Sequence, residues 1–374
     1  MPHVNNILFL LILIKKSVKL GMVEIKKYEY IDSLRGIAVL LVILVHMNGN
    51  PFFPFIINKF INNGQLGVQL FFIVSAFTLV MSYQNRKEEK NREKKFFLRR
   101  FFRIAPMYYI AILCVTIDIL SGYHIYNLRL NEVNPLELLT NIFFINGFFP
   151  EYINRYVPGG WSITVEFTFY FILPFLCKKI NNLNSSILFV LVSLLLSLIF
   201  KIVLSKVLLV NNSDLDFIYL NFISQLPVFS LGILAYWILY DTKKEINTST
   251  IFLIGITIFI FCYFEMPYHF VYSLFFMLLL IALAKKAYRL FSNKILAQIG
   301  KVSFSIYLLH FLFINVFNFS LIQGIGLKVA IINFLIKYVL VTIITFSVAQ
   351  ITYKFVEVPG QNLGRKIIRK YLDR

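Results

Sequence analysis

Long apolar runs separated by short polar loops recur along the whole chain. The runs are about 17 to 25 residues long, which is the length that a helix needs to cross the hydrocarbon core of a bilayer. Of the 374 residues, 59% are hydrophobic and only 15% are charged, a balance far from that of a water-soluble domain. Backbone polar groups inside a bilayer must be bonded within the protein. The chain is therefore predicted to fold as an all-α, polytopic membrane helix bundle.

Ten apolar windows qualify as membrane-spanning helices: residues 33–49, 64–84, 101–121, 161–176, 186–210, 217–240, 250–265, 268–284, 302–320 and 328–352. One further apolar segment, residues 138–149, is too short to span a bilayer. We interpret this segment as a re-entrant or interfacial piece on the outer face. The polar stretches are short loops, so the chemistry is expected to lie within the bundle.

Basic residues indicate the orientation of the bundle. The chain has 37 Lys and Arg against 18 Asp and Glu, and the Lys and Arg residues cluster in loops 85–100, 178–179, 243–244 and 285–301 and in the C-terminal segment. Cytoplasmic loops are enriched in Lys and Arg, and ten spans with both termini in the cytoplasm place all these clusters on that side. The basic excess therefore indicates a multi-pass protein of the inner cell membrane, in contact with lipid, rather than nucleic-acid binding.

The predicted domain organisation is simple. Residues 1–27 form an N-terminal tail, whose translation could begin at Met22; residues 28–360 form the transmembrane domain, and residues 361–374 form a basic cytoplasmic tail. The three cysteines, Cys114, Cys177 and Cys262, lie in apolar segments without CxxC spacing. Neither a disulfide framework nor a metal site is predicted.

Arg35 and His46 are ionisable residues in the first predicted span, and such residues usually mark a pathway or a site. The helical rise separates them by about 16 Å, with Arg35 at the cytoplasmic mouth and His46 in the outer half. Arg35 could alternatively be a positive-inside anchor, and His46 could be a structural histidine whose ring nitrogens are bonded to neighbouring groups.

Glu166 lies about 7 Å below the outer end of its predicted span by the same helical rise. This depth is similar to that of His46, so the carboxylate could orient the imidazole. An ordinary helix–helix hydrogen bond is the alternative interpretation of Glu166.

Three arginines, Arg99, Arg100 and Arg103, open the third predicted span. Arg100 and Arg103 are one helical turn apart and share a face. Guanidinium groups bind phosphate oxygens in pairs, so Arg100 and Arg103 could form a phosphate clamp; the alternative is a positive-inside anchor.

Other polar residues in the spans are possible supporting groups. Ser75 and His310 each lie near the middle of a span, and Tyr307 shares a helix face with His310. His310 could be a second acid/base group, although a packing role is favoured. Trp161, with Tyr152, Asn154 and Tyr156, could contact a sugar or belong to an interfacial aromatic belt, which is the favoured interpretation.

Together these motifs resemble the acyltransferase 3 family of membrane-bound acyltransferases. The similar segments, in the family's order, are IDSLRGIAVLLVILVH, GQLGVQLFFIVSAF, FFLRRFFRIAP, WSITVEFTFY, VSFSIYLLH and FVEVP. The spacing of Arg35 and His46 and the Arg100–Arg103 pair before Pro106 are hallmarks of the family. Departures from its common pattern are Ala76, Phe167 and Val358, none of which alters these arginine and histidine positions.

The resemblance implies a function for these residues. Acyl-CoA, and usually acetyl-CoA, would bind from the cytoplasm as donor substrate, on Arg35, Arg100 and Arg103, with no permanently bound cofactor. The acceptor would be a hydroxyl of a surface or lipid-linked polysaccharide at the outer leaflet. His46 would act as general base or transient acyl carrier, with Glu166 holding its tautomer. Because the base must be neutral, activity should fall as the pH falls through the pKa of His46.

Two other classes of function are compatible with a bundle that contains buried His, Glu and Arg. One is a transporter or flippase of a glycan or small acid, which would have no reason to bind acyl-CoA. The other is a scaffold in which the buried polar groups serve only helix packing. Homo-oligomerisation is possible in any of these cases.

Overall fold

The computed structural model describes residues 29–123, 125–126, 132–207, 212–241, 269–317 and 326–373, and these residues form helices joined by turns and loops. The first helix covers residues 29–46. The following helices are α2 (Phe55–Asn62), α3 (Gly67–Gln84), α4 (Arg92–Ser121), α5 (Pro135–Ile142), α6 (Gly160–Lys179), α7 (Leu183–Val207), α8 (Asn212–Leu220), α9 (Phe222–Tyr240), α11 (His269–Lys285), α12 (Lys294–Lys301), α13 (Ser303–Val316), α14 (Leu327–Thr352) and α15 (Val358–Tyr371). Short helical turns, η1 (Asn63–Leu66), η2 (Asn146–Phe148) and η3 (Tyr353–Glu357), complete the set.

Among the described residues, six helices are long and apolar enough to cross a membrane, or seven if α12 and α13, bent by 78° at their junction, form one span. This confirms the all-helical fold, but not the expected number of ten spans. Helix α11, with 17 residues, falls short of a full span. The predicted span 250–265 lies outside the described residues.

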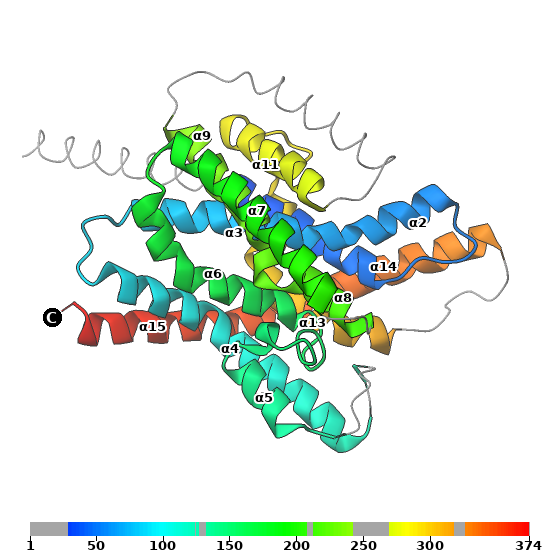
Figure 1. The fold of residues 1–374 in the computed structure, drawn as a ribbon. Helices are drawn as coiled ribbons and strands as arrows, with labels where there is room; N and C mark the ends of the chain where they lie inside the picture. The colour runs from blue at the N-terminus through cyan, green and yellow to red at the C-terminus, as the bar shows by residue number, and fades with distance from the viewer. Residues whose placement is uncertain are drawn as a thin grey trace, which may run out of the picture.

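Helix α3 forms the centre of the bundle and is buried along most of its length. It packs against α6, α9 and α11, which surround it in Figure 1. Helices α3 and α9 come close at Gly232, where a Cβ would meet the backbone of α3 at Ile73. In contrast, α7 exposes leucines along much of its length, as expected for a helix that faces lipid.

The segment 138–149 is not a spanning helix, as predicted. Helix α5 and turn η2 divide it, and the side chain of Asn134 caps α5 by accepting hydrogen bonds from the backbone of Leu136 and Glu137. Two elements this short cannot cross a bilayer.

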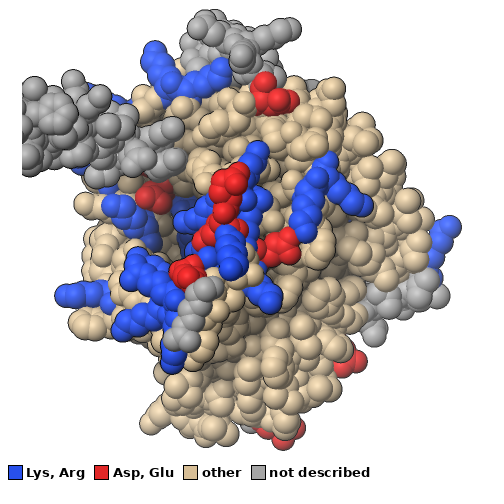
Figure 2. All heavy atoms as spheres, turned by 90° about the vertical axis from the view of Figure 1, so that its left-hand side faces the viewer, with Lys and Arg blue, Asp and Glu red and all other residues tan. Residues whose placement is uncertain are grey.

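The predicted basic C-terminal tail is helical over most of its length. Helix α14 continues through the π-helical turn η3 into α15, which runs beside α4 in Figure 1. Gly360 and Gly364 allow this approach, because a Cβ on either would press on Pro106 or Phe102 of α4. Lys and Arg side chains gather on the face of the bundle where α15 ends (Figure 2), and we call it the basic face.

Candidate active site

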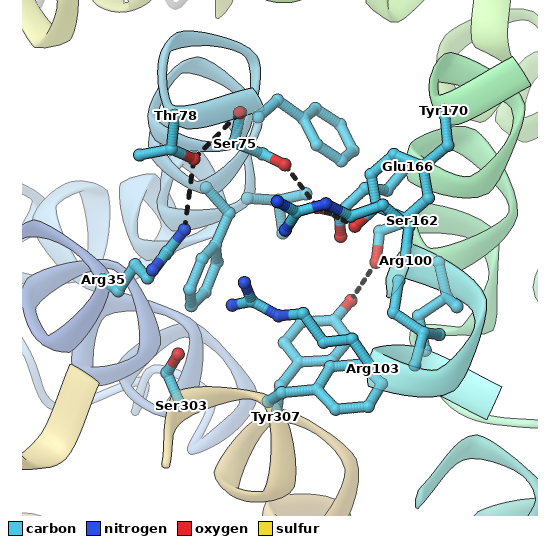
Figure 3. Close-up of a pocket in the computed structure, with 16 residues that line it drawn as sticks. Arg35, Ser75, Thr78, Arg100, Arg103, Ser162, Glu166, Tyr170, Ser303 and Tyr307 are labelled. Atoms are coloured by element: carbon cyan, nitrogen blue, oxygen red, sulfur yellow. Dashed lines mark hydrogen bonds between the residues drawn. The ribbon is translucent and has the colours of Figure 1, made fainter. Parts of the chain in front are cut away.

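A cavity with an empty volume of about 700 Å³ opens between the first helix, α3, α4, α6 and α13. We call it the basic cavity, because Arg35, Arg100 and Arg103 all line it. Figure 3 shows their guanidinium groups converging on the cavity from two different helices. The structure thus brings together the three arginines that the sequence predicted to share a site.

The three guanidinium groups differ in how they are held. Arg35 lies 3.6 Å from the carboxylate of Asp32 and donates a hydrogen bond of 3.3 Å to Thr78. Neither Arg100 nor Arg103 forms a hydrogen bond or an ion pair with another described side chain, and Nε of Arg100 is buried without a partner. Half-buried cations that form no ion pair have lost part of their hydration, so the cavity is electrostatically suited to an anion.

Arg99 lies outside this arrangement. Its guanidinium donates two hydrogen bonds, of 2.9 and 2.8 Å, to the carboxylate of Glu89 in the preceding loop. This pairing lowers the pKa of Glu89. Of the three arginines at the start of the predicted third span, only Arg100 and Arg103 therefore line the cavity.

The Glu166 carboxylate also lies in the basic cavity, where it accepts hydrogen bonds from the hydroxyls of Ser75 and Tyr170. The expected contact with His46 is absent from the hydrogen bonds of the described residues. Similar depth in the membrane did not bring the two residues together, because depth leaves open which side of α6 a residue occupies. The carboxylate lies instead among the arginines, whose charges it partly offsets.

His46 is paired with His310 instead. Nδ1 of His46 lies 2.8 Å from the carbonyl oxygen of Val42 and 3.2 Å from Nε2 of His310, which is fully buried. A carbonyl can only accept, so Nδ1 of His46 carries the proton and Nε2 keeps its lone pair. The ring of Phe311 packs edge-on against His46 at 4.4 Å between centroids. The imidazole is thus held in one tautomer with Nε2 as the basic nitrogen.

His46 lines a second cavity, which we call the histidine cavity, together with Gln69, Trp161 and Tyr219. The histidine cavity lies next to the basic cavity, because Val68 and Tyr307 line both. The Tyr307 hydroxyl is held in place by the carbonyl of Gly159 at 3.0 Å and the hydroxyl of Ser162 at 2.8 Å. Val68 and Tyr307 therefore form a shared wall between an arginine-lined cavity and one that contains a histidine base.

Gly159 lies directly against the Tyr307 side of this wall. Its φ of +74° is in the left-handed region, and a Cβ at this position would lie 2.7 Å from the Tyr307 hydroxyl oxygen. Both constraints favour glycine here.

Some residues of the site were not predicted from the sequence. Tyr170 binds Glu166, and Thr78 binds Arg35. Gln69 donates a hydrogen bond to Tyr219. A tyrosine or threonine in an apolar helix gives little signal, but Gln69 is a buried amide in a predicted span and could have been singled out on that ground.

The fold is that of a helical membrane protein with two differently lined cavities that share Val68 and Tyr307. Comparison with known protein families identifies its family, because the family model of an acyltransferase domain matches residues 28–354. The chain therefore belongs to the acyltransferase 3 family, as its motifs predicted.

Similar curated proteins include the O-acetyltransferase OatA of Staphylococcus aureus, strains NCTC 8325 / PS 47 and COL. Each is 26% identical to this chain over 368 residues, which cover 90% of the chain and 57% of OatA. The chain thus spans little more than half the length of these relatives. No solved structure matches the chain significantly.

Proposed function

We propose that the protein is a membrane-bound O-acyltransferase that moves an acyl group, most simply acetyl, from acyl-CoA to a hydroxyl of a glycan. The observation that carries this proposal is that the basic cavity, which suits an anion, and the histidine cavity, which contains a base, share Val68 and Tyr307 as lining residues. Membership of the acyltransferase 3 family and the similarity to OatA support the same chemistry.

The donor fits the basic cavity. Coenzyme A carries phosphate groups, which guanidinium groups bind in pairs, and Arg100 and Arg103 form no hydrogen bond or ion pair with a described side chain. With the phosphates held there, the thioester would reach the shared wall. We assign Glu166 a positioning role in this cavity, where it limits the repulsion among the arginines.

The acceptor hydroxyl fits the histidine cavity. Nε2 of His46 would take the hydroxyl proton as the oxygen attacks the thioester carbonyl, and the C–S bond would break to release the thiolate of coenzyme A. The proton held on Nε2 would then protonate that thiolate. A relay through an acyl-histidine gives the same products in two steps. In either route the Nδ1 proton, shared between the Val42 carbonyl and Nε2 of His310, keeps Nε2 of His46 available.

The test is transfer of label from radiolabelled acetyl-CoA to the cell-surface glycan by membranes that carry the wild type, His46→Ala, Arg103→Ala or Arg99→Ala. We expect incorporation by the wild type, loss of incorporation in His46→Ala at every donor concentration, and a raised KM for acetyl-CoA in Arg103→Ala. Arg99→Ala is the matched control, since Glu89 already holds that guanidinium outside the cavity. Equal effects of Arg99→Ala and Arg103→Ala would contradict the assigned donor site.

A further inference from the structure

The histidine cavity is the first of three cavities in a row. A second, which we call the middle cavity, shares His46 and Phe311 with the histidine cavity. A third, the asparagine cavity, shares Met47, Asn48 and Lys337 with the middle cavity. Their empty volumes lie between about 770 and 980 Å³. Space for a ligand therefore continues on both sides of His46, along the end of the bundle opposite the basic face.

The three cavities have a common chemistry. Each contains amide and aromatic side chains: Gln69 and Trp161 in the first, Asn315 and Tyr126 in the second, Asn333 and Phe52 in the third. Amides both donate and accept, so they match the hydroxyls of a sugar, and aromatic rings offer apolar faces to its C–H groups. None of the described lining residues is acidic.

Tyr219 presents a hydrogen-bond donor to the histidine cavity. Gln69, only 1% exposed, donates to the Tyr219 hydroxyl oxygen at 3.1 Å. Tyr219 lines the histidine cavity, where its hydroxyl can form a further hydrogen bond with a ligand. A polar group placed in this way indicates a built binding position rather than a packing gap.

We propose that the three cavities form one acceptor groove for a linear oligosaccharide, which lies across His46 and receives the acyl group on an internal sugar. This inference rests on the proposed function and adds the form of the acceptor. A single sugar would fill only the space beside His46. A chain would also contact the groove on both sides, and those contacts would lower its KM.

The test uses oligosaccharides prepared from the cell-surface glycan and fractionated by length, with purified protein and acetyl-CoA. Mass spectrometry of the products should place the acyl group on internal sugars, and kcat/KM should rise with chain length. Tyr219→Phe and Asn333→Ala, at the two ends of the groove, should each raise the KM for long fragments by about three- to tenfold, the effect of one lost hydrogen bond. The KM for acetyl-CoA should not change.

Asn85→Ala is the matched control, because this exposed amide lies at the end of α3 away from the groove. Monosaccharides acylated as efficiently as long fragments, or acyl groups found only at chain ends, would overturn the groove while leaving the acyltransferase intact. Failure to transfer acetyl to acceptors of any length would instead count against the proposed function itself.

Discussion

Single residues decide the chemistry of this site, and His310 is the clearest case. It touches neither proposed substrate but lies 3.2 Å from Nδ1 of His46. When Nε2 accepts a proton, the imidazolium strengthens its hydrogen bond to a neutral His310. In the proposed mechanism the pair would therefore support the charged state that forms during proton transfer.

We expect His310→Leu to lower kcat about 10- to 100-fold, the range for a lost hydrogen bond to a charged group, with the KM for acetyl-CoA unchanged. His310→Gln, whose amide oxygen can replace Nε2 as acceptor, should restore part of this loss. Steady-state kinetics of the two variants, normalised to folded protein, provide the measurement. Equal activity of the Leu and Gln variants would assign His310 to packing alone.

At this scale the sequence predicted which residues matter better than it predicted their partners. Arg35 was singled out as a charge in an apolar helix, and Arg100 and Arg103 by their spacing of one helical turn; the structure gathers all three in one cavity. The pairing of His46 with Glu166 rested on depth alone. Which helix faces meet depends on long-range packing, so the His46–His310 pair was not predicted.

Close helix packing positions these residues at the scale of elements. The first helix and α12 meet at Gly36 and Gly300, where an added Cβ on either residue would collide with a backbone carbonyl of the other helix. The carbonyl facing Gly300 belongs to Asp32, whose side chain pairs with Arg35. The contact thus sets the position of one wall of the basic cavity.

Gly300→Ala should separate the two helices and move Arg35 away from its place in the basic cavity. Overpacking of this kind costs about 1–3 kcal/mol, so we expect a lower melting temperature in detergent and weaker acetyl-CoA binding. Ile295→Ala, which trims an exposed side chain on the same helix, is the control. If Gly300→Ala kept the melting temperature and the acetyl-CoA affinity of the wild type, the prediction would be wrong, because the two helices could then accommodate the extra methyl group.

Element boundaries were predicted less well than element positions. Helix α4 begins at Arg92, nine residues before the expected span at residue 101, because a hydropathy window detects the apolar part of a helix and not its polar first turns. The same reason explains why α15 was predicted as a tail and not as a helix. Its charged residues hide it from a hydropathy window, but the helix packs on α4 at Gly360 and Gly364.

At the scale of the whole molecule, basic side chains are concentrated at one end of the bundle. Lys and Arg, with fewer Asp and Glu among them, gather on the basic face (Figure 2). By the positive-inside rule the basic face should be cytoplasmic, which would give the basic cavity access to cytoplasmic acyl-CoA.

This orientation can be tested with single cysteines in a background where Cys114, Cys177 and Cys262 are alanine. A membrane-impermeant maleimide should label Glu151→Cys in intact cells and Lys366→Cys only in inside-out vesicles. Both side chains are exposed, and they lie at opposite ends of the bundle. Labelling of Lys366→Cys in intact cells would reverse the orientation and with it the proposed source of the donor.

The wall of Val68 and Tyr307 has a consequence for the cell as well as for the reaction. Two polar cavities that entered a membrane from opposite sides would let ions leak and dissipate the gradients if they joined into an open pore. In the proposed reaction the Tyr307 ring, held by two hydrogen bonds, would keep salts and the bulky nucleotide carrier apart, while the acyl group passes outward and the proton of the acceptor hydroxyl passes inward to the thiolate. Such an exchange moves no net charge, so the protein would export a chemical modification without drawing on the membrane potential.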